Sequence, residues 1–160
     1  MDLRLTIELV PSTAWGHNLR DLLTREQWDT LRRLTYSHYG YRCGVCHASN
    51  TTLYCHEQWE YDDTTHLQKL VGLVALCKMC HHCKHLGHAG ILASRGELDF
   101  EQMIAHFLRV NGCSRDDYDA HSRQAWATWQ ERSTYEWTTD IGKYARFARR
   151  KPSTDAHECL

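Results

Sequence analysis

Cysteine and histidine side chains gather in one stretch of the chain, residues 41–88. This stretch holds six of the eight cysteines and seven of the twelve histidines. Two C-x2-C pairs frame it, Cys43 with Cys46 and Cys77 with Cys80. A thiolate pair at this spacing suits a tight turn in which both sulfurs reach one ion, and two such pairs supply the four ligands of a tetrahedral zinc site. The sequence therefore predicts a structural zinc ion held by these four cysteines.

The gap between the two cysteine pairs exceeds the usual zinc-ribbon spacing, so it must hold folded structure of its own. Residues 53–61 are rich in strand formers, and residues 67–76 are apolar enough for a second strand, with Gly72 as a bulge or bend. A short helix over residues 78–86 follows, and the second cysteine pair fixes its start. The expected local order is strand, loop, strand, helix, with zinc joining the ends.

Eight cysteines are also compatible with a disulfide scaffold. The N-terminal residues lack the basic and apolar regions of a signal peptide, and no apolar stretch is long enough to cross a bilayer. We therefore expect a cytoplasmic protein without membrane contact, in a reducing compartment where paired cysteines bind metal. The formal net charge is −1, so a nucleic-acid partner would have to be bound by local basic patches.

The flanking residues predict further elements. Residues 3–9 alternate between apolar and polar, which indicates a half-buried strand. Thr24 with Gln27 resembles a capping box for a helix that ends at Gly40. Residues 99–134 predict a C-terminal helical extension, residues 134–141 a strand that pairs with residues 3–9, and residues 143–151 a basic tail. These elements suggest a single α+β domain over residues 1–160.

Three parts of the chain resemble the HNH endonucleases: Cys55-His56, the run Leu76-Cys77-x2-Cys80-His81, and the approach GYRCGVC. The resemblance implies a ββα-metal core over about residues 41–88 and a metal-dependent enzyme that hydrolyses DNA phosphodiester bonds. The strings VPSTAWGHNLRDLL and HEQWEYDD are similar to one bacterial and phage branch of HNH proteins.

The resemblance also implies roles for individual residues. His56 matches the general base, and a neutral imidazole suits proton abstraction near pH 7. Cys55 and His81 match the ligands of a catalytic ion, which would be Mg, Mn, Ni or Zn. A thiolate at Cys55 favours the softer ions. His85 lies one helical turn after His81 and is a further candidate ligand.

Other polar side chains crowd the same region. Four acids follow His56 and are candidate ligands or hydrogen-bond acceptors: Glu57, Glu60, Asp62 and Asp63. Without a metal, these acids would repel a phosphate backbone. We expect His82 and His88 to face solvent.

Two departures from the family pattern leave a second interpretation open. Gly72 stands where the family has an asparagine that orients the base histidine, and Cys55 is an unusual catalytic ligand. The alternative is a catalytically inactive zinc-binding module that docks on nucleic acid or on a protein partner. The expected partner of the enzyme is DNA, with RNA and protein as alternatives, and the sequence leaves the oligomeric state open.

Overall fold

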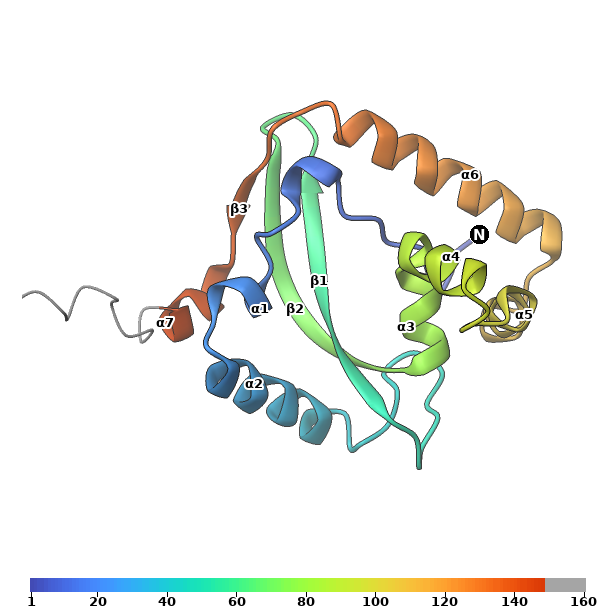
Figure 1. The fold of residues 1–160 in the computed structure, drawn as a ribbon, viewed down its shortest axis with the longest axis horizontal. Helices are drawn as coiled ribbons and strands as arrows, with labels where there is room; N and C mark the ends of the chain where they lie inside the picture. The colour runs from blue at the N-terminus through green and yellow to red at the C-terminus, as the bar shows by residue number, and fades with distance from the viewer. Residues whose placement is uncertain (149–160) are drawn as a thin grey trace, which may run out of the picture.

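A computed structural model describes residues 1–148 and shows a mixed α+β protein (Figure 1). Its centre is a three-stranded sheet in the order β1-β2-β3. β1 (Leu53–Asp62) and β2 (Leu67–Cys77) form a long antiparallel hairpin, and β3 (Thr138–Asp140) runs parallel to β2. β1 is therefore an edge strand, and only one of its two edges is paired within the described sheet.

The hairpin lies where the sequence predicts two strands, and its irregularity lies at Gly72. The register shifts between Gln58 and Trp59, and Gly72 lies opposite Gln58 at this point. A Cβ on Gly72 would approach Gln58 Oε1 to 2.8 Å. The predicted bulge is thus confirmed, and a larger residue at position 72 would require the Gln58 side chain to move.

The helices form two groups beside the sheet (Figure 1). The first group precedes the hairpin and consists of η1 (Ser12–Ala14), α1 (Leu19–Leu22) and α2 (Arg25–His38). The second follows it and consists of α3 (Lys78–Lys84), α4 (Leu86–Ser94), α5 (Phe100–Asn111) and α6 (Arg115–Arg132). η2 (Gly142–Tyr144) and α7 (Ala145–Ala148) come after β3.

Local signals in the sequence account for the ends of the longer helices. The Thr24 side chain accepts from the backbone N–H of Gln27 in a complete capping box at the start of α2. Asp99 caps α5 and Ser114 caps α6, because each side chain accepts from a backbone N–H in the first turn of its helix. α5 ends at Gly112, which adopts the left-handed conformation (φ 60°) that glycine accommodates without strain.

Two hydrophobic clusters hold these groups of helices to the sheet. The larger one joins β2 to α3–α6, and Phe107, Met103 and Leu76 are fully buried within it. The smaller one joins α1 and α2 to β2 through Leu19, Leu31 and Leu70. The β1–β2 hairpin therefore has a packed element on each side, which fixes the direction of its side chains.

The N-terminal segment, residues 2–10, is not a strand, so the expected pairing of residues 3–9 with residues 134–141 is wrong. Its backbone is bonded instead to helix side chains: the Leu5 N–H donates to Asn111 Oδ1 and the Ile7 N–H to His121 Nε2, each at 2.9 Å. Leu5 and Ile7 are nevertheless buried in the larger cluster. The alternating pattern thus identifies side chains that are buried, but the segment does not form a strand, and β3 pairs with β2.

The basic tail is only partly within the described residues. Lys143 lies in η2 and Arg146 in α7, while Arg149, Arg150 and Lys151 lie outside the described part of the chain. No helix within residues 1–148 is both long enough and apolar enough to cross a bilayer.

Candidate functional site: two clusters of metal-binding side chains

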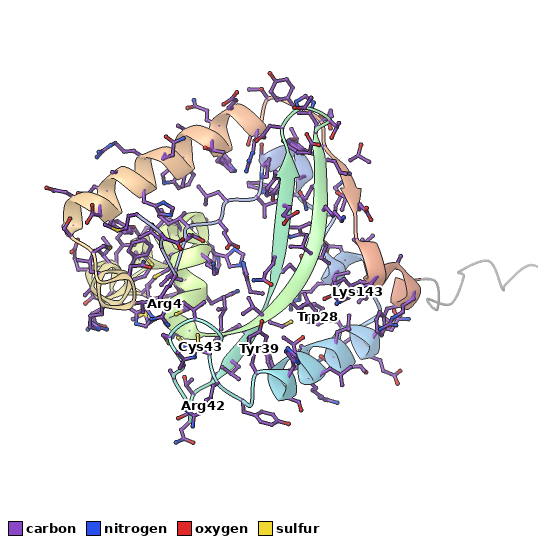
Figure 2. The ribbon with its side chains drawn as sticks, turned by 180° about the vertical axis from the view of Figure 1, so that it is seen from behind. Arg4, Trp28, Tyr39, Arg42, Cys43 and Lys143 are labelled. Carbon is purple, nitrogen blue, oxygen red and sulfur yellow. The ribbon has the colours of Figure 1, made fainter. Side chains whose placement is uncertain are left out.

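The first cluster consists of the sulfurs of Cys43, Cys46, Cys77 and Cys80, which all lie within 4.8 Å of one another. The first two come from the turn between α2 and β1, and the others from the junction of β2 and α3. Cys46 Sγ lies 3.6 Å from Cys77 Sγ, close to the edge of about 3.8 Å expected for a tetrahedron with Zn–S bonds of about 2.3 Å. The predicted group is thus assembled, and it can hold a metal ion such as zinc. Figure 2 labels Cys43, which lies beside the end of the hairpin where α3 begins.

Backbone hydrogen bonds shape the first cysteine turn. The Cys43 N–H donates to Ala48 O at 3.0 Å, and the His47 N–H donates back to Cys43 O at 3.0 Å. His47 adopts a left-handed conformation (φ 64°) in this turn. The Gly44 N–H donates to Ala75 O of β2 at 2.8 Å, so the turn is bonded to the strand that leads to the second cysteine pair.

The thiols of this cluster favour a metal over a disulfide. All seven cysteines in the described part of the chain are free thiols. Hydrogen bonds with Cys77 and Cys80 lower the pKa of Cys43, while hydrogen bonds with Cys43 and Cys77 raise the pKa of Cys80. One thiolate among four close sulfurs thus opposes ionisation of the others. A divalent cation would remove this opposition, which is the usual reason for four cysteines to converge.

The sequence does not predict that a histidine contacts the cysteine cluster. His106 on α5 places Nε2 3.2 Å from Cys80 Sγ. Burial lowers the pKa of His106, so the ring is neutral near pH 7 and can donate an N–H to the sulfur. This contact ties α5 to the cluster, but no cysteine or histidine spacing marks it, because α5 is remote in sequence.

The second cluster consists of three imidazoles. His56 comes from β1, and His81 and His85 come from α3 and its C-terminal cap; their ring nitrogens lie within 4.8 Å of one another. His56 Nδ1 is 3.1 Å from His85 Nε2. The predicted spacing of one helical turn between His81 and His85 thus brings both rings to His56.

Burial keeps the His81 and His85 imidazoles neutral. Together with the charges of neighbouring histidines, it lowers the pKa of His81 to about 3 and that of His85 to about 4. Tyr54 stacks on His81 with ring centroids 5.0 Å apart and an interplanar angle of 6°. Neutral imidazoles offer the lone pairs that a metal ion requires, so these residues can bind a cation without releasing a proton.

Cys55 does not join the histidine cluster, because successive side chains of β1 point to opposite faces of the sheet. Its thiol faces α2, where it contacts the Thr35 hydroxyl, and burial raises its pKa to about 11. The structure therefore separates the two residues that the family resemblance pairs. A thiol in this position is protonated at neutral pH and packs like a small apolar group.

An acid that the sequence does not predict at this site also reaches His56: Glu8, from the N-terminal segment. Glu8 Oε2 lies 2.6 Å from His56 Nε2, and Oε1 accepts from Lys84 Nζ at 2.6 Å. Burial opposes ionisation of Glu8, but the hydrogen bonds and charges of His56 and Lys84 lower its pKa to about 2. Sequence reasoning missed Glu8, because a single acid in an alternating segment carries no spacing signal.

The acids that follow His56 do not gather at the cluster. Glu57 faces the first group of helices, accepts from the Leu19 N–H at 2.7 Å, and has its pKa raised to about 7 by burial. Asp62 accepts from the backbone of the hairpin turn, and Asp63 pairs with Arg132 at 2.7 Å. Their predicted repulsion of a phosphate backbone therefore does not act at the histidine cluster.

The remaining histidines of this region differ in exposure. His88 is exposed, as expected. His82 is buried instead: the residue is 8% exposed, and both ring nitrogens are buried without a protein hydrogen-bond partner. The expectation that His82 faces solvent is wrong, because its side of α3 packs toward the larger hydrophobic cluster rather than outward.

A cavity of about 1370 Å³ borders the histidine cluster and Glu8. Its wall includes side chains from both faces of β1. Four arginines from α1, α2 and α6 also line it: Arg20, Arg25, Arg32 and Arg132. Arg32 pairs with Asp29 and Arg132 with Asp63, whereas Arg20 and Arg25 have no ion-pair partner within residues 1–148.

Comparison with known proteins adds no family assignment: the chain matches no family model, no curated protein and no solved structure. What the fold and the site define is a mixed α+β protein with a four-cysteine cluster that can hold a metal ion.

Proposed function

We propose that this protein is a metal-dependent endonuclease of HNH type that hydrolyses DNA phosphodiester bonds. Support comes from the order of the elements: an antiparallel hairpin runs directly into α3, and the four-cysteine cluster joins the hairpin to that helix. This is the arrangement that the sequence resemblance leads one to expect. A zinc ion on the four cysteines would be structural, since four protein ligands leave no open coordination position.

The observation that carries the proposal is the meeting of His56, His81 and His85 at the wall of a large cavity. Three protein ligands leave a coordination position open for water or substrate, as in catalytic rather than structural metal sites. When bound, the divalent ion would lower the pKa of a water molecule and offset the negative charge that develops on the phosphate. A cavity of this size can admit a nucleotide segment.

The geometry favours a ligand role for His56 over the role of general base. Its ring is 4% exposed, Nε2 contacts Glu8, and Nδ1 points to His85. A general base needs a nitrogen that can reach the attacking water. The proposal therefore assigns His56, His81 and His85 to the catalytic ion and leaves Cys55 outside the site.

Two arginines are the candidates for holding the substrate. Arg20 and Arg25 line the cavity from α1 and α2 and are free of ion pairs within residues 1–148. Their guanidinium groups can bind phosphate oxygens bidentately. They supply the local positive charge that a protein with a net charge of −1 needs in order to bind DNA.

Cleavage of supercoiled plasmid in Mg, Mn, Ni and Zn tests the proposal. The wild-type protein should nick the plasmid in at least one ion, and His81→Asn and His56→Ala should each lower the rate at least about 100-fold, since each removes a ligand of the ion. The matched control is His38→Asn on α2, an exposed histidine that does not line the cavity. No cleavage with any of these ions, or equal rates for wild type and His81→Asn, would refute the proposed endonuclease activity.

A second candidate function is a zinc-binding module without catalysis. The observation that favours it is the near-complete burial of His56 with both ring nitrogens engaged. Metal analysis of the purified protein separates the two candidates. One tightly held zinc and no second ion supports the module, whereas a second, exchangeable ion that is lost in His81→Asn supports the enzyme.

A further inference from the structure

Within residues 1–148, the N-terminal segment makes one hydrogen bond to the histidine cluster, and Glu8 makes it. The Glu8 N–H donates to Lys84 O at 3.0 Å, which fixes its backbone against α3. Its carboxylate then divides its two oxygens, one to His56 Nε2 and one to Lys84 Nζ, both at 2.6 Å. The carboxylate is thus held at its backbone and at both oxygens.

The contact with Glu8 selects the tautomer of His56. The Glu8 carboxylate already accepts from Lys84 Nζ through Oε1, and its Oε2 lies 2.6 Å from His56 Nε2, so this geometry places the ring hydrogen on Nε2. A neutral ring that carries its proton on Nε2 has its lone pair on Nδ1. That nitrogen is the one that faces His85, at 3.1 Å. Carboxylates commonly orient metal-binding histidines in this way, and removing them weakens metal binding 10–100-fold.

Glu8 also compensates a buried positive charge. The Lys84 side chain is 7% exposed, and its residue neighbours His85 in sequence. Besides Glu8, its ammonium group donates only to Thr6 Oγ1, at 3.3 Å, among the described residues. An uncompensated ammonium group next to the cluster would repel a cation. The Glu8 carboxylate therefore offsets the charge of Lys84 in addition to orienting the His56 ring.

We propose that Glu8 is a positioning residue for the histidine metal site: it holds His56 with Nδ1 directed at the ion and neutralises Lys84. The inference rests on the metal site of the proposed function but is independent of hydrolysis. The N-terminal segment then contributes to the metal site through Glu8. Loss of cleavage with intact metal binding would refute the endonuclease and leave the role of Glu8 standing.

The first test needs no substitution. Long-range ¹⁵N–¹H correlation spectra of the wild-type protein, with only the four-cysteine site loaded with zinc, report the tautomer of each histidine. His56 should carry its proton on Nε2 at pH 7, and the assignment follows from the signal missing in His56→Ala. A proton on Nδ1 of His56 would overturn the proposal.

The second test measures metal affinity directly. Protein with zinc in the four-cysteine site is titrated with Co²⁺, whose visible absorption reports binding to imidazoles. Glu8→Ala should weaken Co²⁺ binding by about 10–100-fold. Glu8→Gln should weaken Co²⁺ binding less than Glu8→Ala does, because the amide oxygen still accepts from His56 Nε2. The matched control is Glu60→Gln, which removes the same charge from an exposed position on β1 and should leave the affinity within about threefold of wild type.

Three outcomes would overturn the role of Glu8. One is a Glu8→Ala variant that is folded, by its urea midpoint, and binds Co²⁺ as tightly as wild type. Another is a loss beyond about 1000-fold with a changed absorption band, which would make Glu8 a ligand of the ion rather than its support. The third is the absence of a second Co²⁺ ion in the wild-type protein.

Discussion

At the scale of single residues, Gly44 shows how tightly the first cysteine turn is packed. A Cβ built there would lie 2.7 Å from Tyr39 Cε1 and 2.7 Å from Val74 Cγ2, and the valine belongs to β2. We expect Gly44→Ala to lower the free energy of unfolding by about 1–3 kcal/mol, the usual effect of overpacking a core. Urea denaturation of the zinc-loaded protein measures this change.

Gly90 provides the matched control for Gly44. It lies in α4, and a Cβ there would meet no atom within 4 Å. Gly90→Ala should therefore raise the free energy of unfolding by about 0.5–1 kcal/mol, because alanine is the better helix former. Equal effects of the two substitutions would show that the first turn is looser than the structure indicates.

The pKa values of His81 and His85 predict how the metal-free protein responds to acid. Burial holds both pKa values below the ordinary 6.5, at about 3 and about 4. As pH falls below 6.5, the unfolded chain binds protons that the folded protein does not, so stability falls. Glu57, with its pKa raised to about 7, opposes part of this loss, so we expect a net loss on the order of 1–2 kcal/mol per pH unit between pH 6 and 5, measured by urea denaturation.

His81→Asn separates this effect from other titrations. It should make the decline between pH 6 and 5 clearly shallower, because one of the two histidines is gone. Glu8 does not interfere: its pKa is lowered from 4.5 to about 2, so the stability that it contributes is lost only as pH falls below about 4.5. An unchanged slope in His81→Asn would contradict the buried, neutral state of this ring.

At the scale of elements, the cysteine cluster joins three pieces of structure. It connects the turn after α2 to the end of β2 and to the start of α3. Removal of zinc with a chelator, or Cys77→Ser, should therefore lower the free energy of unfolding by several kcal/mol, since metal binding and folding share their free energy. Denaturation followed by circular dichroism measures the free energy of unfolding, and a metal assay measures the zinc content.

Cys113→Ser is the control for the zinc prediction. Cys113 follows α5 and lies outside the cluster. It should keep one zinc per protein and unfold within about 0.5 kcal/mol of wild type. If Cys77→Ser were as stable as Cys113→Ser, the four cysteines would not form a structural metal site.

Elements with local determinants could be predicted from the sequence. The capping residues Thr24, Asp99 and Ser114 and the two apolar runs of the hairpin each act over a few residues, so α2, α5, α6, β1 and β2 lie where expected. The partner of an extended segment is a long-range property. Residues 3–9 alternate like a strand, but the choice between a strand and the side chains of α5 and α6 depends on the assembled fold.

At the scale of the whole molecule, the candidate site divides in the same way. The four cysteines and the pair His81 and His85 have spacings that local geometry explains, so they could be found without a structure. The family resemblance assigns Cys55 to the site, but the alternation of β1 turns its thiol to the opposite face. Glu8 and His106 reach their clusters from elements far away in sequence, and only the packing of the complete chain brings them there.

Asn111 tests whether the N-terminal segment is coupled to the histidine cluster through the whole molecule. Its amide accepts from the Leu5 N–H and donates to Leu5 O, both at 2.9 Å, and Leu5 is fully buried. Asn111→Ala leaves both backbone groups without these partners, so we expect a loss of about 2–3 kcal/mol. The segment should also become more susceptible to proteolysis, because its local opening is favoured.

If Glu8 positions His56, loosening this segment must also weaken the metal site. Asn111 lies at the end of α5 and touches neither His56 nor Glu8 by a hydrogen bond, so any change in Co²⁺ affinity is transmitted by the segment itself. We expect a weakening of about 2–10-fold, smaller than for Glu8→Ala, because opening is only partial. Gln130→Ala, an exposed amide on α6, should change neither proteolysis nor affinity. Faster proteolysis of the N-terminal segment in Asn111→Ala at unchanged Co²⁺ affinity would show that the segment and the metal site are energetically independent.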